Sequence, residues 1–375
     1  MKVLILSTYE KTGGAAIAAG RLRQALERRG VEVAMLWRRN IRTPRLLRRV
    51  CPPLARALEK QSWTSIMERA VIWAAGGFSR KDLWATDIAL FGQDITGTRE
   101  YREADVVHLH WVNQGFVSLS AIRRFIRDGK RVVWTMHDAW NTAGMYHLMD
   151  QWQDSRLERW TERRKMRLYA LDGIRFVACS GWLTEVAHRS RLMRSLPVRR
   201  IPNPIDTETF RPLRAEGRGR RILFVAQKVD NPMKGIRYLE EAVALLRGDD
   251  AVRLTALGRD MPYIDNAEGM ARLYNEVDAF VLPSLSENLP NTIMEAMACG
   301  TPCVGFGIGG IPEMIDHREN GYVARYRDAK DLAEGIRYVL DSKNHERLGK
   351  AAREKVLRSY SEESVATQYI KLYNS

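Results

Sequence analysis

The sequence has 375 residues, of which 45% are hydrophobic and 28% charged, and its formal net charge is +15. This length predicts two globular domains, and the apolar content excludes a disordered chain. No apolar run approaches the ~20 residues that a membrane-spanning helix needs. The chain starts with a short apolar run followed by charge, without the long apolar region and cleavage site of a signal peptide, so we expect a cytoplasmic protein.

The positive charge is concentrated in the first half of the chain. Residues 1–205 contain 36 Lys and Arg against 19 Asp and Glu, whereas the remainder contains 24 against 26. Net charge bears on the partners of a protein rather than on its fold. The first half is therefore predicted to meet something anionic.

The first half alternates short apolar runs with polar, helical segments. A helix is predicted over residues 15–30, closing on Gly30, and strands are predicted at residues 2–9, 31–37, 105–111, 131–138 and 175–180. Continuous apolar strands that alternate with helices are typical of a parallel sheet covered on both faces.

The stretch from Trp37 to Arg80 departs from this alternation. It mixes basic residues with Leu, Val, Ile and Trp, which predicts amphipathic helices that could lie on an anionic membrane surface. The arginines that would hold the protein there are Arg42, Arg45, Arg48 and Arg49. The alternative is a solvated basic face over an ordinary insertion.

The second half repeats the strand–helix alternation. Strands are predicted at residues 221–227, 252–258, 279–284, 302–307 and 321–324, and a last helix at 361–374. Prolines interrupt both patterns at residues 199–212. We therefore predict an N-terminal α/β domain over 1–203, a C-terminal α/β domain over 204–357, and a helix in 358–375 that crosses back to the first domain.

The four cysteines have no spacing typical of a disulfide framework or of a metal site. They are Cys51, Cys179, Cys299 and Cys303. Reduced, structural thiols are expected, in keeping with a cytoplasmic protein.

Residues 283–306 contain the most informative motif. The strand ending near Pro283 leads to a helix whose first turn is predicted to contain Pro290, and Gly300 is predicted to end that helix in the left-handed conformation. Two glutamates, Glu287 and Glu295, flank the helix start.

The start of this helix is a candidate phosphate site. Helix N-termini at the carboxyl ends of parallel strands bind anions, and the residues assigned to that turn are Asn288, Leu289, Asn291 and Thr292. Carboxylates suit vicinal hydroxyls, so Glu287 and Glu295 could hold two diols on opposite sides of one diphosphate. That ligand would be a nucleotide sugar; the alternative is two ordinary surface glutamates.

The motif resembles the Glu-x7-Glu signature of the family-four retaining glycosyltransferases of GT-B fold. Residues 307–315, "GIGGIPEMI", match the downstream Gly-Gly-x-Pro-Glu element of that family. Residues 201–212, "IPNPIDTETFRP", resemble its hinge segment, although Pro204 stands where the family usually has glycine. The resemblance implies two Rossmann-like, doubly wound α/β domains that face a cleft.

The resemblance also implies roles for individual residues of the second half. Glu295 would bind the ribose of the nucleotide, and Glu287 the hydroxyls of the donor sugar. Lys228 and Lys234 have the spacing of the Arg-x5-Lys pair that binds the diphosphate, with lysine in place of arginine. Lysine keeps the charge but loses the planar, bidentate fork of the guanidinium group.

In the first half, the resemblance assigns three residues. Gly13 and Gly14 match the glycine loop after the first strand, where the backbone approaches the donor and the acceptor; a simple tight turn is the alternative. His137 matches the active-site histidine, although a His-Asp pair at a strand end is more often structural.

No metal or other cofactor is expected. His108 and His110 alternate onto one face of their strand and, with His137, could suggest a metal site. The resemblance argues against that interpretation, because such enzymes stabilise the leaving diphosphate with lysines and a helix N-terminus.

The predicted function is transfer of a sugar from a nucleoside diphosphate to a hydroxyl, with the anomeric configuration kept, in cell-surface polysaccharide or glycoconjugate synthesis. The acceptor would be a glycan, a lipid-linked sugar or another hydroxyl compound, and the protein would be cytoplasmic or peripheral at the inner face of the membrane. Alternatives are a phosphorylase and a nucleotide-sugar binder without turnover. A nucleic-acid-binding protein would explain the basic half but neither glutamate, and no nucleic acid is expected as a partner.

Overall fold

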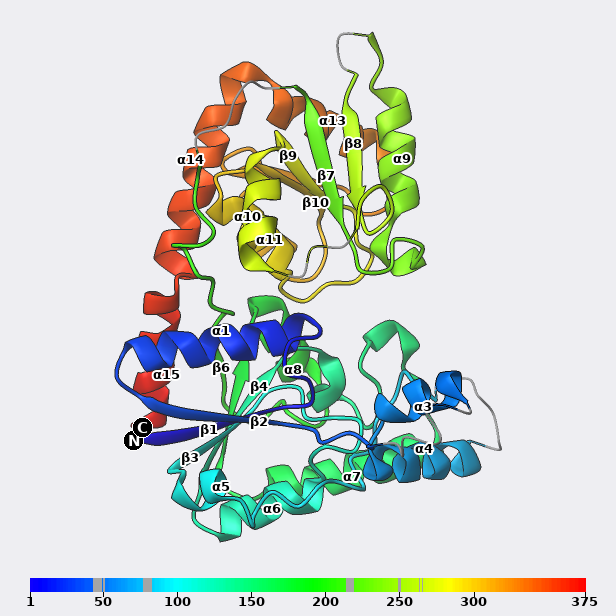
Figure 1. Cartoon of the computed structure of the whole chain (residues 1–375), viewed down its shortest axis with the longest axis vertical. Helices are drawn as coiled ribbons and strands as arrows, with labels where there is room; N and C mark the ends of the chain where they lie inside the picture. The colour runs from blue at the N-terminus through cyan, green and yellow to red at the C-terminus, as the bar shows by residue number, and fades with distance from the viewer. Residues whose placement is uncertain are drawn as a thin grey trace. The chain divides into compact units, whose positions relative to one another are not determined.

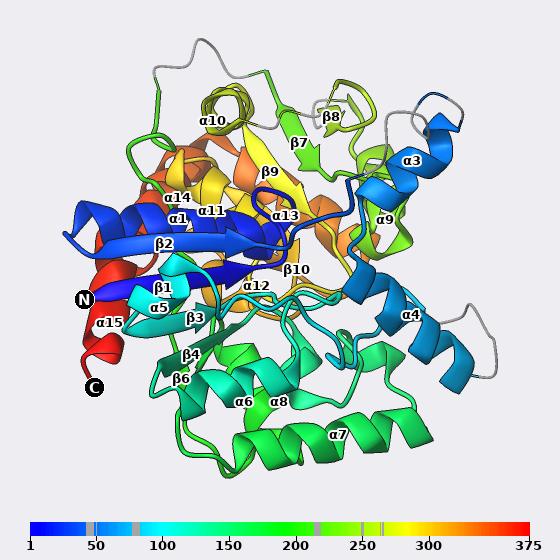
Figure 2. The same cartoon turned by 60° about the horizontal axis from the view of Figure 1, so that its bottom comes forward.

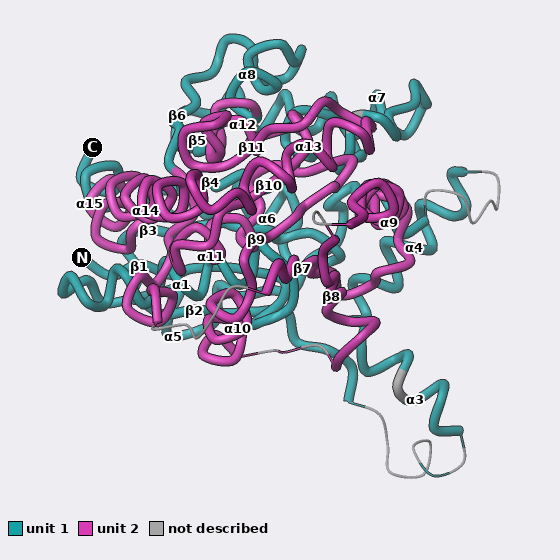
Figure 3. The backbone as a smooth tube through the Cα atoms, turned by 90° about the horizontal axis from the view of Figure 1, so that it is seen from above, with its two compact units in different colours: residues 1–179, 183–201, 369–375 teal, residues 180–182, 202–368 magenta. Residues whose placement is uncertain are grey.

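The computed structural model describes residues 1–42, 49, 51–76, 83–213, 219–248, 251–262, 264 and 266–375. They form two compact units, which Figure 3 shows in two colours. Unit 1 comprises residues 1–179, 183–201 and 369–375, and unit 2 comprises residues 180–182 and 202–368. Each unit contains one parallel sheet with helices on both faces (Figure 1).

The sheet of unit 1 has the strand order β2-β1-β3-β4-β5-β6. Its strands are β1 (Lys2–Ser7), β2 (Glu32–Trp37), β3 (Val106–Leu109), β4 (Arg131–Met136), β5 (Ile174–Ala178) and β6 (Val198–Arg200). All neighbouring pairs are parallel. Residues 3–6 of β1 are at most 1% exposed, because helices cover both faces of the central strands.

The helices of unit 1 pack on both sides of this sheet. They are α1 (Gly14–Arg28), α3 (Pro52–Glu59), α4 (Trp63–Ala75), α5 (Arg99–Glu103), α6 (Leu119–Arg127), η1 (Ala139–Thr142), η2 (Met149–Gln151), α7 (Arg156–Tyr169) and α8 (Gly181–Arg189), whose first two residues belong to unit 2. Figures 1 and 2 show α1 on one face of the sheet and α6 with α7 on the other.

The sheet of unit 2 has the order β11-β10-β9-β7-β8. The strands are β7 (Arg221–Val225), β8 (Arg253–Leu257), β9 (Ala279–Leu282), β10 (Cys303–Phe306) and β11 (Gly321–Ala324). The helices are η3 (Pro232–Lys234), α9 (Ile236–Leu245), α10 (Ala267–Asn275), α11 (Asn291–Ala298), α12 (Ile311–Met314), α13 (Ala329–Leu340), α14 (Ser342–Ser359) and α15 (Glu362–Tyr373), which ends in unit 1.

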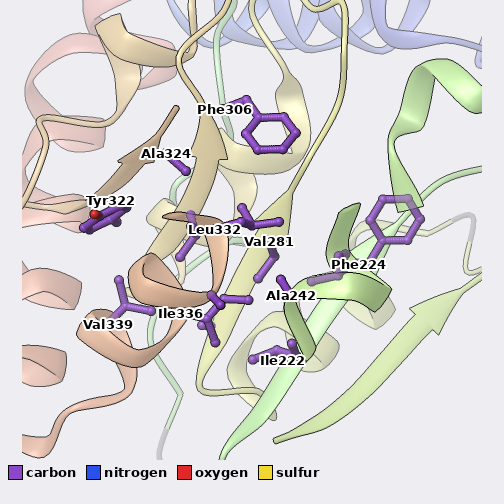
Figure 4. Close-up of a cluster of buried hydrophobic side chains, with 14 of the residues drawn as sticks. Ile222, Phe224, Ala242, Val281, Phe306, Tyr322, Ala324, Leu332, Ile336 and Val339 are labelled. Carbon is purple, nitrogen blue, oxygen red and sulfur yellow. The ribbon is translucent and has the colours of Figure 1, made fainter. Parts of the chain in front are cut away.

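The core of unit 2 lies between its sheet and the helices α9 and α13 (Figure 4). Ile222 and Val281 project from the strands, and Leu332 and Ile336 from α13; all four are fully buried. The strand side chains are β-branched, which suits the pleated surface, whereas Leu332 and Ile336 lie one helical turn apart and so share a face.

Most predicted elements are confirmed, with three differences. The short edge strand β6 was not predicted, because "VRR" contains a single apolar residue. Pro290 precedes α11 instead of lying in its first turn, so that prediction was wrong by one residue. In the stretch 37–80, α3 and α4 confirm the predicted helices, but the two charged side chains of α4 are buried. Arg45 and Arg48 lie outside the described residues, whereas Arg42 and Arg49 are described and exposed.

Three further predictions concern the thiols, the end of α11 and membrane spans. All four cysteines are free, as expected. Gly300, with a φ of +76°, ends α11 in the left-handed conformation as expected. Among the helices of the described ranges, none is long and apolar enough to cross a bilayer.

The packing of α13 generates the first testable prediction. Truncating Ile336 to alanine should leave a cavity in the unit-2 core and cost about 2–4 kcal/mol of unfolding free energy. Urea denaturation followed by circular dichroism measures this loss. Leu245→Ala, at a helical position that is 48% exposed, serves as the control and should change the midpoint little. Equal effects of the two substitutions would contradict the assigned core.

Candidate functional site

The candidate site in unit 2 lies where β7, β9 and β10 end. These strands are neighbours in the sheet and run parallel, so the loops that follow them meet at one edge. The loop after β9 donates the N–H of Leu285 to the carbonyl of Met233, at 2.8 Å, in the segment after β7. The predicted site residues of the second half fall into these loops and the helices that follow them.

Lys234 is held at this edge by the glycine that follows it. Gly235 has a φ of +68°, and a Cβ there would lie 1.9 Å from the carbonyl oxygen of Pro283. Only glycine permits both this conformation and this close approach. As a result α9 begins against the end of β9, and Lys234 lies two residues before the first residue of this helix.

Lys234 and Glu287 form an ion pair. The distance from Nζ of Lys234 to Oε1 of Glu287 is 2.6 Å, and the two side chains are 35% and 17% exposed. A pair with this exposure contributes only about 0–1 kcal/mol to folding. The pair therefore adds little to stability, although it joins the segments that follow β7 and β9.

The backbone around Glu287 is fixed by the glycines of the β10 loop. Gly309 has a φ of +54°, and a Cβ there would lie 1.7 Å from the carbonyl oxygen of Glu287. Gly310 donates its N–H to the carbonyl of Asn288 at 2.7 Å. The element "GIGGIPEMI" is thus a backbone support for the loop that carries Glu287 and Asn288.

Glu295 lies one turn into α11 and is only 7% exposed. Its Oε2 accepts a hydrogen bond of 3.0 Å from the hydroxyl of Tyr274 in α10. Burial, with the neighbouring carboxylate second, raises the pKa of Tyr274 well above its ordinary value, so Tyr274 remains a donor at neutral pH. The Glu295 carboxylate is therefore held in one orientation.

The other predicted residues of unit 2 surround the start of α11. Asn291 is its first residue and accepts a hydrogen bond of 3.2 Å from the side chain of Asn203. Thr292 is half-buried, and Leu289 is buried with 6% exposure. Lys228 lies in the exposed turn after β7.

In unit 1, Gly13 and Gly14 form the junction between the β1 loop and α1. Gly13 precedes the helix with a φ of +89°, and a Cβ there would meet no atom within 4 Å. The backbone conformation, not crowding, thus requires glycine at position 13. Gly14 is the first residue of α1.

His137 directly follows β4 and contacts His110. Nε2 of His137 lies 2.9 Å from Nδ1 of His110, while His108 contacts the hydroxyls of Tyr373 at 2.7 Å and Thr135 at 2.8 Å. Burial lowers the pKa of His137 to about 4 and that of His108 to about 3. Both imidazoles are therefore neutral at physiological pH. Within the part of the chain that the structure describes, no group of three His, Cys, Asp or Glu side chains could hold a metal ion.

Next to His137, a histidine between two carboxylates was missed by sequence reasoning. His147 contacts Asp138 at 2.7 Å through Nδ1 and Asp87 at 2.9 Å through Nε2. Burial opposes the charge, but the two carboxylates outweigh it and raise the pKa of His147 to about 9. Asp87 lies 60 positions before His147, so no local spacing could have indicated the contact.

The pKa of His147 predicts a pH-dependent contribution to stability. A group whose pKa is raised on folding stabilises the protein fully below its unfolded-state value of 6.5, and the contribution is lost as the pH rises through about 9. We expect His147→Gln to cost on the order of 2 kcal/mol near pH 6, the equivalent of one to two pKa units. The melting-temperature difference between wild type and variant should shrink between pH 7 and 9; a difference independent of pH would contradict the charged imidazolium.

Known proteins resemble this chain in parts of the sequence and over the whole fold. N-acetyl-alpha-D-glucosaminyl L-malate synthase of Bacillus anthracis is 34% identical over 30% of this chain and 29% of its own length. MMP alpha-(1->4)-mannosyltransferase of Mycolicibacterium hassiacum is 29% identical over 46% and 47%. The matched region is thus less than half the length of either relative.

Solved structures match over the entire length. Sucrose-phosphate synthase from Thermosynechococcus elongatus superposes with a TM-score of 0.64 at 18% identity, covering 100% of this chain and 98% of that one. Anabaena HepE in complex with UDP-glucose gives a TM-score of 0.60 at 14% identity, covering 100% and 99%. At these identities the likeness concerns the fold, which is GT-B, as the sequence predicted.

Two family models match the chain. The model described as "Glycosyl transferases group 1" matches residues 219–342, which contain Lys234, Glu287 and Glu295. The model described as "Glycosyltransferase Family 4" matches residues 12–209, which contain Gly13, Gly14 and His137. The second match covers more than half of the sequence, and the chain therefore belongs to Glycosyltransferase Family 4.

Proposed function

We propose that this protein is a retaining glycosyltransferase that moves a sugar from a nucleoside diphosphate to a hydroxyl acceptor. The observation that carries the proposal is the Lys234–Glu287 pair at 2.6 Å, beside the start of α9 and one loop before α11. A cation next to a carboxylate suits a ligand that presents a diphosphate and a sugar side by side. The names of the relatives, one a mannosyltransferase, support sugar transfer.

In this proposal, the diphosphate of the donor lies between Lys234 and the start of α11. The helix dipole places partial positive charge at the start of α11, and helix N-termini in this position favour bound anions. Asn288, Leu289, Asn291 and Thr292 form the turn that would surround the phosphates. Lys228, exposed in the preceding loop, would add a second positive charge.

The two glutamates bind the two parts of the donor that carry hydroxyl groups, the sugar and the ribose. Glu287 binds hydroxyls of the sugar, exchanging its contact with Lys234 for contacts with the ligand. Glu295, oriented by Tyr274, binds the ribose. Anabaena HepE has been solved with UDP-glucose, and that ligand is of the proposed class.

The chemical step would need charge stabilisation rather than a metal or another cofactor. As the glycosidic bond breaks, negative charge grows on the departing diphosphate, and Lys234 and the α11 N-terminus stabilise it. A diphosphate oxygen takes the acceptor proton as the acceptor attacks from the same face, which retains the anomeric configuration. Gly13 and Gly14 would allow close approach of the donor, and the neutral His137 would help to position it.

The acceptor is proposed to be a glycan or a lipid-linked sugar. One relative, from Campylobacter jejuni, is named N,N'-diacetylbacillosaminyl-diphospho-undecaprenol alpha-1,3-N-acetylgalactosaminyltransferase and is 32% identical over 38% of this chain and 41% of its own length. Its name describes a sugar on a polyprenyl diphosphate, which is an acceptor of this kind.

The role of Lys234 predicts the effect of neutralising it. Lys234→Gln should weaken binding of the preferred nucleoside diphosphate about 10- to 100-fold, because one contact to the diphosphate is lost. Isothermal titration with UDP, GDP, ADP and TDP measures this effect. Lys330→Gln, an equal change of charge at an exposed position of α13, is the matched control and should bind like wild type. Equal affinity of the Lys234 variant and the control would contradict the assignment.

The stereochemistry of the product tests the reaction itself. Proton NMR of the wild-type reaction should show a glycosidic product with the anomeric configuration of the donor sugar. Glu287→Gln should lower the rate at least ~10-fold, because it weakens hydroxyl contacts that strengthen in the transition state. A product with inverted configuration would refute retention, and binding without turnover of any acceptor would reduce the function to donor binding.

A further inference from the structure

Helix α4 of unit 1 exposes an apolar face. Trp63 is 68% exposed, Met67 49% and Trp73 42%, and Ala70 and Ala74 are exposed between and beside them. Positions 63, 67, 70 and 74 follow helical spacing, so they form one stripe along the helix. Figure 2 shows α4 at the periphery of unit 1.

The two charged side chains of the same helix face the protein, together with the buried Ile72. Glu68 is fully buried and accepts the N–H groups of Ile88 and Ala89 at 2.9 and 3.0 Å. Arg69, 6% exposed, forms an ion pair with Asp87 and donates to the carbonyl of Thr86 at 2.6 Å. The usual arrangement of a surface helix, with apolar side inward and charges outward, is thus reversed for these residues.

The start of α4 is also fixed. Ser62 caps the helix by accepting the N–H of Ser65 at 3.1 Å, and the hydroxyl of Thr64 donates to the carbonyl of Gly115 at 2.5 Å. Gly115 has a φ of +71°, and a Cβ there would lie 2.3 Å from the backbone nitrogen of Ser65. The helix therefore cannot rotate to bury its apolar stripe without breaking these contacts.

The exposed charges among the described residues of the stretch 37–80 are mainly basic. Arg38 and Arg69 are buried and do not contribute to that surface. Glu68 is also fully buried, whereas Arg39, Arg42, Arg49 and Lys60 are exposed. An apolar stripe flanked by basic residues is complementary to a surface whose outer layer is negatively charged and whose interior is apolar.

We propose that α4 docks on an anionic lipid bilayer, with its apolar stripe at the boundary between headgroups and acyl chains. Trp63 and Trp73 suit this boundary because indole combines a large apolar surface with one polar N–H. The surrounding basic residues contact anionic headgroups. Each of these contacts contributes more binding free energy at low salt than at high salt. A second copy of the chain fits less well, since pairing two α4 stripes would bring two basic surfaces together.

The proposal goes beyond the sugar-transfer chemistry and does not depend on it, because docking needs no donor. The test uses the full-length protein and co-sedimentation with vesicles of phosphatidylcholine, alone or mixed with phosphatidylglycerol. The variant is Trp63→Ser with Met67→Ser, which keeps the charge. The matched control is Leu245→Ser with Leu357→Ser, at helical positions that are 48% and 44% exposed in unit 2. Circular dichroism melts show whether each variant is folded.

The expected result is partition into mixed vesicles at least ~10-fold stronger than into neutral ones, and weakened by salt. The α4 variant should partition into these vesicles at least ~10-fold less than wild type, because the substitutions remove apolar surface. The control variant should partition like wild type. Equal binding to neutral and anionic vesicles, or an unchanged α4 variant, would overturn the proposal. The proposal would also be overturned if the protein did not bind vesicles but self-associated in a concentration-dependent way, and if the α4 variant lost that self-association.

Discussion

The contact between Gly235 and the carbonyl of Pro283 is the constraint on which the unit-2 site depends. It brings the start of α9 against the end of β9, so Lys234 reaches Glu287 across 2.6 Å. Gly309 plays the same part on the other side, where its missing Cβ leaves room for the carbonyl of Glu287. Loops after neighbouring parallel strands naturally converge. The two glycines fix the backbone of these loops, and this fixes the distance between the cation and the carboxylate.

In unit 1, burial and neighbouring carboxylates set the protonation states of three histidines. Burial lowers the pKa values of His108 and His137, so both are neutral, whereas Asp87 and Asp138 raise the pKa of His147 and keep it charged. One histidine on β3 and two in the segments after β4 thus differ in charge because of their surroundings alone. In the proposed reaction, a neutral His137 would orient the donor without placing a positive charge next to an oxocarbenium-like sugar.

Much of the fold could be predicted because the strands are apolar runs and because glycines such as Gly30 and Gly300 follow the ends of helices. Glu287 and Glu295 were singled out because their spacing resembles the Glu-x7-Glu signature of the family; from the chemistry of the residues alone, two ordinary surface glutamates remained the alternative. Other features depend on distant residues. The burial of Glu68 relies on N–H groups some 20 positions later in the chain. The anchoring of Glu295 relies on Tyr274, 21 positions earlier. Neither α4's reversed orientation nor this hydrogen bond has a local sequence signal, because tertiary contacts decide both.

A crystal structure of the protein with the nucleoside diphosphate that binds it most tightly tests the central claim most directly. The account predicts electron density for the diphosphate within hydrogen-bonding distance of Lys234 Nζ and of the first N–H groups of α11, with the ribose hydroxyls on Glu295. The Lys234–Glu287 contact should lengthen when the ligand enters. Density for the nucleotide elsewhere in unit 2, with the ion pair intact at 2.6 Å, would contradict the account.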